Sequence, residues 1–380
     1  MPSPPVIMHK IAEHSAFISR LEAAIGELRP WPEEKFNELA LELFSLQFNS
    51  VPPYRSFCAA KNATPGNVKS WRAIPAIPTE AFKEFELTSL TSSEREFVFL
   101  SSGTTQMQAS RHFHDCESMK LYEKSLLPWF KHHLLADLDL RDFTFLILTP
   151  DSAAAPNSSL VHMFDTVRGK FAERNSAFVG RIGIPGTWEL DVEAATTYLR
   201  AATERGRPLI VLGTALGFLD LVDMLAKRDV RFALPAQSRI LETGGYKSRS
   251  RTKSKAEVYA AIQFHLGVAE SSIISEYGMT ELSSQAYDLS ARSNESSPHA
   301  SLTSRQFRFP PWAKTRIISP ETGLDVQQGE SGLIQVFDLT NVRSVFAIQT
   351  SDVGRRLAEG FQLLGRAAQT VIRGCSLHSA

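Results

Sequence analysis

Short apolar runs alternate with amphipathic segments between about residue 96 and residue 274, and this alternation restricts the fold more than any other feature of the chain. Four runs are predicted to be buried strands: "REFVFL" (95–100), "DFTFLILT" (142–149), "RPLIVLG" (207–213) and "SRILET" (238–243). Helical spacing of apolar residues predicts helices between them, as in "ALGFLDLVDMLAKRD" (215–229) and "KSKAEVYAAIQFHLG" (253–267). Such alternation predicts an α/β fold with a largely parallel sheet.

The two flanks of this region have different patterns. Residues 1–95 are predicted to be mainly helical, with Pro32 near the start of a helix in "WPEEKFNELALELFSLQFNS" (31–50). Two proline-rich stretches there, "VPPYRSF" and "IPAIPTEAF", are typical of connectors. After about residue 310, two predicted strands joined by a turn-rich link indicate a small antiparallel β region. We therefore expect a helical region (1–95), a core (96–364) and a short tail (365–380).

Composition excludes several classes of protein. The 380 residues include 41 basic and 41 acidic side chains, so the formal net charge is zero. A neutral chain gives no support for binding to nucleic acid or to acidic membranes in general. We expect no transmembrane segment, because no apolar run approaches the length of a membrane span. The N-terminus lacks the long apolar stretch of a signal peptide, so we expect a cytoplasmic protein.

Three cysteines, Cys58, Cys116 and Cys375, lie far apart in the sequence. Their odd number and the lack of a CxxC spacing argue against a disulfide framework or a zinc site. Cys375 lies five residues from Ala380. On position alone it is either an incidental thiol or a reactive one.

The stretch "SSGTTQMQAS", residues 101–110, directly follows a predicted strand. Successive backbone N–H groups and hydroxyls in such a loop can bind phosphate oxygens. It is not a Walker A sequence, because no GK[ST] follows. Taken alone, the stretch is compatible with a phosphate cradle or with a plain surface loop.

The stretch "ISEYGMTEL", residues 274–282, places an aromatic residue, a glycine, a threonine and an acid close together. Tyr277 offers a flat face for a purine, and Thr280 can donate to a phosphate or a carboxylate. Glu281 can hold Mg²⁺ that also binds nucleotide phosphates. In isolation, a solvated glutamate in a turn at a strand end is the simpler interpretation of Glu281.

Two further stretches carry candidate ligands. In "LETGGYKS" (241–248), Gly244 and Gly245 would let a flat ring approach the backbone, and Lys247 could reach a phosphate. The charge run around Lys247 is equally typical of a solvated face. In "TSDVGRR" (350–356), Asp352 could accept hydrogen bonds from ribose hydroxyls or lie in a surface turn.

The order of these motifs, continued by "GESGLIQV" and "LLGR", resembles the adenylate-forming superfamily of acyl-CoA ligases, luciferases and adenylation domains. The resemblance covers about residues 97–375 and is most specific in "SSGTT" and "YGMTE". It implies the large N-terminal domain of that superfamily, with ATP and Mg²⁺ as cofactors. It favours the phosphate cradle over the plain loop.

The resemblance also implies roles for individual residues. The phosphate loop would consist of Ser101, Ser102, Gly103, Thr104 and Thr105. The adenine pocket would consist of Gly244, Gly245 and Tyr277. The remaining positions would be Thr280 near the α-phosphate and substrate carboxylate, Glu281 on Mg²⁺, Asp352 on the ribose and Arg366 at the hinge.

The chain departs from the superfamily pattern beyond the hinge. Most members continue into a C-terminal domain that carries a catalytic lysine, and they have an aspartate at the hinge. This sequence lacks that aspartate and ends fifteen residues after Gly365, so we expect that domain to be largely absent. The expected substitutes for the lysine are Lys247 and Arg111.

The motifs "TGGYK" and "SEYGMTEL", with the ending "RGCSLHSA", resemble the acyl-protein synthetases of bacterial bioluminescence, the LuxE type. In that family the enzyme converts a fatty acid to acyl-AMP, takes the acyl group onto a cysteine near its C-terminus and passes it to a reductase. Cys375 occupies the position of that cysteine. Arg373 or His378 beside it would favour the thiolate.

The resemblance thus implies an ATP-dependent ligase that acts on a medium- or long-chain fatty acid and delivers a thioester to a reductase or an acyltransferase. Two alternatives stay open. One is an acyl- or aryl-CoA ligase similar to phenylacetate-CoA ligases. The other is a non-catalytic protein that binds a nucleotide or an acyl group.

Overall fold

The computed structural model describes residues 4–102, 109–139, 143–172, 176–184, 186–245, 253–288 and 305–367. The chain divides into two compact units. Unit 1 comprises Met1–Pro128, Met279–Ala286 and Gln306–Ala380, and unit 2 comprises Trp129–Gly278 and Tyr287–Arg305. The domain boundaries expected from the sequence stay a prediction.

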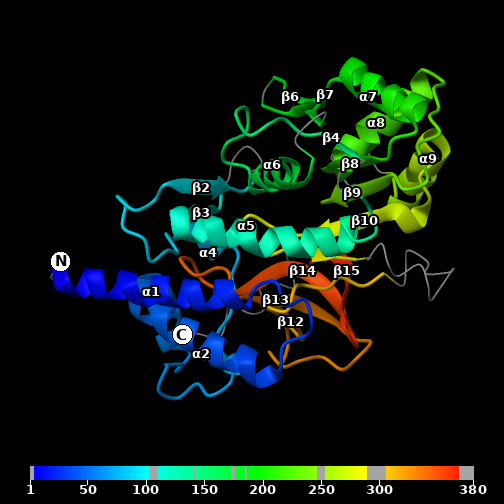
Figure 1. The fold of residues 1–380 in the computed structure, drawn as a ribbon. Helices are drawn as coiled ribbons and strands as arrows, with labels where there is room; N and C mark the ends of the chain where they lie inside the picture. The colour runs from blue at the N-terminus through cyan, green and yellow to red at the C-terminus, as the bar shows by residue number, and fades with distance from the viewer. Residues whose placement is uncertain are drawn as a thin grey trace. The chain divides into compact units, whose positions relative to one another are not determined.

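A six-stranded sheet forms the centre of unit 2, in the order β11-β10-β9-β8-β4-β5 (Figure 1). The neighbouring pairs β4–β5, β4–β8, β8–β9 and β9–β10 are parallel, as the sequence predicts. The strands are β4 (Thr144–Ile147), β5 (Ala177–Phe178), β8 (Leu209–Thr214), β9 (Arg239–Thr243), β10 (Ile273–Tyr277) and β11 (Ala286–Tyr287). A small antiparallel pair in the same unit joins β6 (Gly180–Ile182) to β7 (Trp188–Leu190).

The helices of unit 2 begin and end at residues suited to those positions. The Ser254 hydroxyl and the Glu257 carboxylate form a capping box at the start of α9, and Gly267 ends it with φ +70°. Asp191 caps α7, whose last residue is followed by Gly206 with φ +63°. The helices are α6 (Ser159–Phe171), α7 (Val192–Arg205), α8 (Ala215–Lys227) and α9 (Lys255–Leu266), with short turns η2 (Lys131–Leu135) and η3 (Glu270–Ser272).

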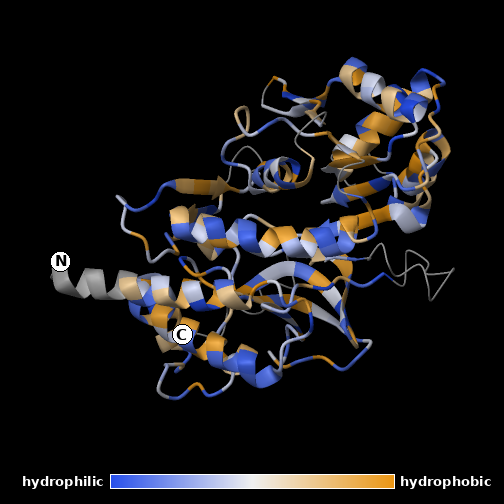
Figure 2. Cartoon of the chain, in the orientation of Figure 1, coloured by the Kyte–Doolittle hydropathy of each residue, from blue (hydrophilic) through white to orange (hydrophobic). Residues whose placement is uncertain are grey.

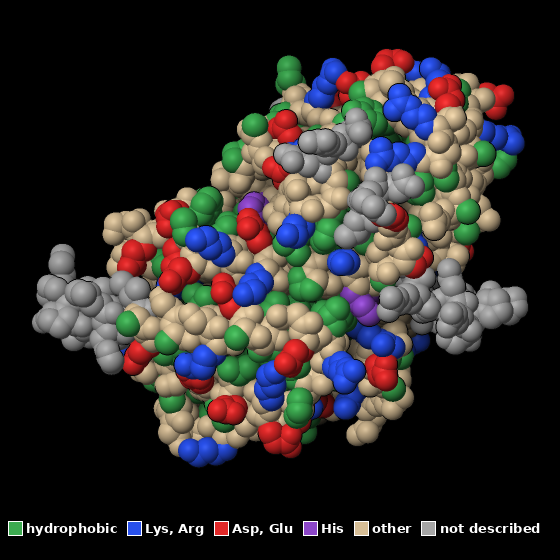
Figure 3. Space-filling model, viewed as in Figure 1, with side chains coloured by type: hydrophobic (Ala, Val, Ile, Leu, Met, Phe, Trp, Pro, Cys, Tyr) green, Lys and Arg blue, Asp and Glu red, His purple; other side chains and the backbone are tan. Residues whose placement is uncertain are grey.

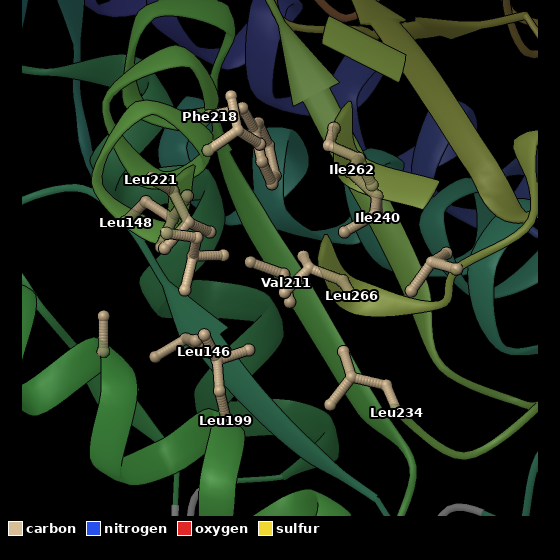
Figure 4. Close-up of a cluster of buried hydrophobic side chains, with 14 of the residues drawn as sticks. Leu146, Leu148, Leu199, Val211, Phe218, Leu221, Leu234, Ile240, Ile262 and Leu266 are labelled. Atoms are coloured by element: carbon tan, nitrogen blue, oxygen red, sulfur yellow. The ribbon is translucent and has the colours of Figure 1, made fainter. Parts of the chain in front are cut away.

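A continuous apolar core lies between this sheet and helices α7, α8 and α9 (Figure 4). Val211 and Ile240 contribute from strands, and Phe218 and Ile262 contribute from helices. All four side chains are fully buried. The predicted helices over 215–229 and 253–267 are confirmed, because their apolar faces make up this core.

The N-terminal part of unit 1 is helical, as predicted. Its elements are α1 (Pro4–Ala24), α2 (Glu33–Ser50), α3 (Pro52–Ala60), η1 (Trp71–Ala73) and α4 (Ala81–Glu84), and α5 (Cys116–Phe130) follows later in the chain. Pro32 is the N-cap of α2. The interpretation of "VPPYRSF" as a connector is wrong, since its prolines occupy the first turn of α3, where a missing N–H costs no hydrogen bond.

A five-stranded sheet completes unit 1. It has the order β1-β14-β13-β12, and β15 also pairs with β14. Pairs β12–β13, β13–β14 and β14–β15 are antiparallel, which confirms the antiparallel region expected after residue 310. The strands are β1 (Ile77–Pro78), β12 (Ala313–Ile318), β13 (Ser331–Asp338), β14 (Ala347–Leu357) and β15 (Gly360–Arg366).

The predicted strand "REFVFL" exists, but its assignment as a buried strand is wrong. β2 (Phe97–Leu100) pairs only with β3 (Arg111–His114), in a separate antiparallel ribbon. The strand is apolar throughout, as its orange colour in Figure 2 shows, yet Phe97 is 44% exposed and only Phe99 is buried. A two-stranded ribbon has one face free of the core, so an apolar run there does not ensure burial.

Basic and acidic side chains are interspersed on the face shown in Figure 3, in keeping with the zero net charge. Among the described residues, no helix is both long enough and apolar enough to cross a bilayer.

Candidate functional site

The two ends of the Ser/Thr/Gly loop are joined at the end of the β2–β3 ribbon in unit 1. The Ser101 amide donates to the Ser110 carbonyl oxygen at 3.1 Å, and the Ser110 amide donates to the Ser101 hydroxyl at 2.9 Å. Ser102 is exposed. Gly103, Thr104 and Thr105 lie outside the described residues, so the phosphate-cradle role of the loop stays a prediction.

Between β10 and β11 the chain has no regular secondary structure; Thr280 is half-buried, and the residues from Glu281 to Gln285 are buried. Buried backbone groups need hydrogen-bond partners, and side chains from other elements supply them here. His112 Nδ1 donates to the Thr280 carbonyl oxygen at 2.9 Å, and Asn341 Nδ2 donates to the Glu281 carbonyl oxygen at 2.7 Å. Burial lowers the pKa of His112 to about 4, so its ring is neutral at pH 7.

Asp338 holds the next two residues of the same segment. Its carboxylate accepts hydrogen bonds from the Ser283 amide at 3.0 Å and from the Ser284 amide at 2.7 Å. The hydroxyls of Ser284 and Thr340 donate to its other oxygen, at 2.8 Å and 2.6 Å. Asp338 is fully buried at the end of β13, so the segment is tied to the five-stranded sheet.

Glu281 is only 7% exposed, so the solvated glutamate suggested by its sequence in isolation is wrong. Burial raises the pKa of its carboxyl, while the Ser110 hydroxyl and the cations Lys83 and Arg366 act in the opposite direction. The Ser110 hydroxyl is itself buried and makes no hydrogen bond of normal geometry with any described residue. The structure therefore brings the last residue of the stretch 101–110, the Glu281 carboxyl and two cations close enough to interact electrostatically.

Asp352 lies within strand β14, so its interpretation as part of a surface turn is wrong. It is the register partner of Arg366 on β15, and Arg366 Nε lies 3.7 Å from Asp352 Oδ1. The Arg366 side chain is 87% exposed, whereas that of Asp352 is 17% exposed. The predicted ribose ligand and the predicted hinge arginine are thus adjacent, with the arginine available to other partners.

Helix α4 brings residues to this region that the sequence analysis did not select. The Phe82 ring packs edge-on against His112, with 6.4 Å between the ring centroids. Glu80 Oε1 accepts a hydrogen bond from the Ser351 hydroxyl at 2.7 Å, one residue before Asp352. Lys83 follows Phe82 directly. The sequence analysis assigned "IPAIPTEAF" to a proline-rich connector. A lysine directly after its final phenylalanine was the local feature that could have drawn attention to this stretch.

Arg111, one expected substitute for the superfamily lysine, is already engaged. Its Nη1 lies 3.5 Å from the Glu86 carboxylate, and both residues belong to unit 1. Lys247, the other expected substitute, lies outside the described residues.

The predicted adenine-pocket residues belong to unit 2. Parallel pairing of β9 and β10 aligns Thr243 with Glu276, so Gly244 and Tyr277 follow at corresponding ends of the two strands. Gly244 has φ +85°, a conformation that favours glycine. A Cβ added to Gly244 or Gly245 would meet no described atom within 4 Å, which leaves room beside the backbone.

The same two strands carry buried carboxylates that the sequence analysis missed. Glu242 accepts a hydrogen bond from the Tyr259 hydroxyl at 2.9 Å and pairs with Lys255 at 3.0 Å. Glu276 accepts from the Thr243 hydroxyl. Glu242 is followed by Thr243, and Glu276 is preceded by Ser275, so the local sequence does not mark either carboxylate as buried.

Comparison with known proteins gives the chain a family. The family described as "Acyl-protein synthetase, LuxE" matches residues 31–379. The chain belongs to the LuxE acyl-protein synthetase family. This match confirms the prediction that the protein is a ligase of the acyl-protein synthetase type.

Two curated relatives of this LuxE-family chain are long-chain-fatty-acid–luciferin-component ligases. That of Aliivibrio fischeri is 20% identical over 326 residues, which cover 84% of this chain and 78% of that protein. That of Vibrio harveyi is 21% identical over 372 residues, which cover 93% of this chain and 90% of that protein.

The fold of the LuxE-family chain resembles that of a 2-hydroxyisobutyryl-CoA ligase. The open conformation of that enzyme, in complex with 2-HIB-AMP and CoA, has a TM-score of 0.65 at 11% identity and matches 90% of this chain and 76% of its own. Its post-adenylation state has a TM-score of 0.64. The likeness confirms the predicted adenylate-forming fold.

The Glu281 site suits a magnesium ion that is shared with a nucleotide. Mg²⁺ in nucleotide enzymes takes one or two carboxylates and completes its shell with phosphate oxygens and water. Among the described residues, no group of three or more His, Cys, Asp or Glu side chains could hold a metal ion. A metal ion at Glu281 would therefore need phosphate oxygens and water as its other ligands. A single buried carboxyl beside the unsatisfied Ser110 hydroxyl fits this pattern.

The two described cysteines are poor nucleophiles. Burial raises the pKa of the Cys58 thiol to about 11. Cys116 is exposed, and its thiol donates to the Glu96 carboxylate at 2.9 Å, which raises its pKa. Thiolate is the reactive form of cysteine, so neither is suited to attack at neutral pH. Cys375 lies outside the described residues.

Glu276 predicts a specific dependence of stability on pH. Burial, reinforced by the charge of Glu242, raises the pKa of the Glu276 carboxyl to about 7 from an ordinary 4.5. Its stabilising contribution is complete below pH 4.5 and is lost as the pH rises to 7. Glu276→Gln should therefore increase in stability relative to wild type over this range, by up to about 3 kcal/mol.

Denaturant unfolding at pH 4.5 and at pH 8 measures this difference. Glu204→Gln, an exposed residue of α7, is the matched control and should show no such trend. An equal stability difference at both pH values for Glu276→Gln would contradict the assignment.

Proposed function

We propose that this protein activates a carboxylic acid with ATP as acyl-AMP and then takes the acyl group onto Cys375 as a thioester. The observation that carries the proposal is the Thr280–Glu281 segment with its buried Glu281 carboxyl, fixed by His112 and Asn341 and close to the cations Lys83 and Arg366. Membership of the LuxE family supports the two-step chemistry. The names of the two Vibrionaceae relatives favour a long-chain fatty acid as the substrate.

In the first step, a carboxylate oxygen of the substrate attacks the α-phosphorus of ATP. The bond from phosphorus to the bridging oxygen breaks, and pyrophosphate leaves with the electron pair. In our proposal Thr280 donates a hydrogen bond to an α-phosphate oxygen, Asp352 binds the ribose, and Gly244, Gly245 and Tyr277 bind the adenine. Bound Mg²⁺ would neutralise phosphate charge, with Glu281 as its protein ligand.

In the second step, the Cys375 thiolate attacks the acyl carbon and AMP leaves. The high pKa of Cys58 and the hydrogen bond from Cys116 to Glu96 support Cys375 as the acceptor, because they remove two competing thiols. The thioester would then pass to a reductase or an acyltransferase. A cytoplasmic location also stays a prediction.

Glu281→Gln should abolish acid-dependent pyrophosphate exchange, with a loss of about 100-fold or more, because the neutral amide removes the charge that binds the cation. The fold should persist, since burial already disfavours the ionised carboxyl and glutamine has the same shape. Exchange and thermal melting are measured on the same preparation.

Glu38→Gln is the matched control, since Glu38 is an exposed residue of α2 in the same unit. It should exchange pyrophosphate at the wild-type rate. Wild-type exchange by a folded Glu281→Gln protein would refute the role of Glu281.

Cys375→Ser should keep pyrophosphate exchange and lose the stable thioester, because a serine hydroxyl is hardly ionised near neutral pH. Enzyme, ATP, Mg²⁺ and labelled fatty acid are incubated together, and label that neutral hydroxylamine releases is quantified. Cys116→Ser, which removes an exposed thiol, should label normally.

Hydroxylamine-sensitive labelling of the Cys375→Ser protein would exclude Cys375 as the acyl carrier. If wild type instead forms acyl-CoA from free CoA and Cys375→Ser does so equally well, a CoA ligase is the correct assignment. Failure of wild type to exchange pyrophosphate with any acid would favour a non-catalytic binding protein.

A further inference from the structure

The residues directly before Lys83 in the chain fix its position in unit 1. Before it, β1 pairs with β14, the Thr79 amide donates to the Gln349 carbonyl oxygen at 3.0 Å, and Glu80 accepts from Ser351. Beside it, Phe82 is fully buried and packs against His112, the residue that binds the Thr280 backbone. Lys83 therefore lies between the strand that carries Asp352 and the segment that carries Thr280 and Glu281.

Among the described residues, no carboxylate forms an ion pair with Lys83. The Lys83 side chain is half-buried. Of the other two basic candidates of this region, Arg111 pairs with Glu86, and the exposed Arg366 lies 3.7 Å from Asp352. Lys83 therefore has a charge available to an anionic ligand.

The electrostatics of Glu281 agree with this placement. The Lys83 ammonium acts on the Glu281 carboxyl as a nearby positive charge. The two side chains are thus close enough to interact but not paired. Lys83 is therefore suited to bind an anion that also binds the metal ion predicted at Glu281.

We propose that Lys83 binds the α-phosphate of ATP and stabilises the negative charge that develops there during adenylation. This role rests on the proposed function and assigns to the N-terminal helical part of unit 1 a catalytic cation that its sequence did not indicate. As the carboxylate oxygen bonds to phosphorus and pyrophosphate departs, Lys83 stays protonated and transfers no proton. Its contribution is electrostatic, which is often the largest single contribution to the rate of such a step.

Binding of AMP and of adenosine tests this role without turnover. Both are titrated calorimetrically into wild type and Lys83→Met, an uncharged variant of similar shape. Lys83→Met should weaken AMP binding by about 10-fold and leave adenosine binding unchanged, because only AMP carries the phosphate. Lys83→Arg, which keeps the charge, should restore much of the AMP affinity.

Acid-dependent pyrophosphate exchange is then measured on the same proteins. Lys83→Met should reduce kcat by about 100- to 1,000-fold, the range for loss of one group that stabilises transition-state charge. Lys69→Met removes an exposed lysine from the same unit and should match wild type in binding and exchange.

The outcomes separate the two proposals. If wild type exchanges pyrophosphate and Lys83→Met matches Lys69→Met in AMP binding and rate, the role of Lys83 is refuted while the proposed function stands. If Lys83→Met weakens adenosine and AMP binding equally, Lys83 does not recognise the phosphate and the role is also refuted. If wild type binds neither ligand and exchanges no pyrophosphate, both proposals fail.

Discussion

Residues 280–284 have no regular secondary structure, so their backbone amides and carbonyl groups depend on hydrogen bonds with side chains of other elements in unit 1. His112 comes from β3, whereas Asp338 and Asn341 lie three residues apart at the end of β13, and together they bind backbone groups along the segment. All three side chains are buried, so water cannot replace them at low cost. The conformation of Thr280 and Glu281 is consequently set by the β2–β3 ribbon and the five-stranded sheet together.

This arrangement also explains how a carboxyl is kept in a buried position. An isolated buried charge is unfavourable and is normally paired or neutralised. Glu281 has the Ser110 hydroxyl and two cations near it, but no cation of the described residues forms an ion pair with it, so burial still raises its pKa. Glu276 of unit 2 is also buried, but a hydroxyl donates to one of its oxygens, and burial raises its pKa to about 7, so that the carboxyl is about half protonated at pH 7. Carboxyls with perturbed pKa values gather at functional sites, and this supports the proposal that Glu281 is a metal ligand.

Residues with local sequence signals were predicted well. The helices α8 and α9, the parallel strands β8 and β9 and the antiparallel region after residue 310 follow from periodicity, turns and caps that lie within or next to each element. Gly244 and Gly245 could be selected because a glycine pair after a strand is a local signal. The exposure of β2 could not be predicted, since an apolar run does not reveal how many strands will join the sheet.

The residues that hold the candidate site have no local signal. His112 binds a backbone group 168 residues away, and Asn341 binds one 60 residues away. Lys83 lies near the candidate site because β1 pairs with β14, a contact between segments about 270 residues apart. The motif "YGMTE" indicated which residues could bind a nucleotide, but partners brought together by folding determine how they are held.

The location of the divalent cation tests the central claim most directly. Crystals of the protein with Mn²⁺ and a non-hydrolysable ATP analogue would place the metal by its anomalous scattering. We expect a peak at about 2.1 Å from a carboxylate oxygen of Glu281, with phosphate oxygens among its other ligands. A phosphate-bound metal without Glu281 in its coordination shell would contradict the account.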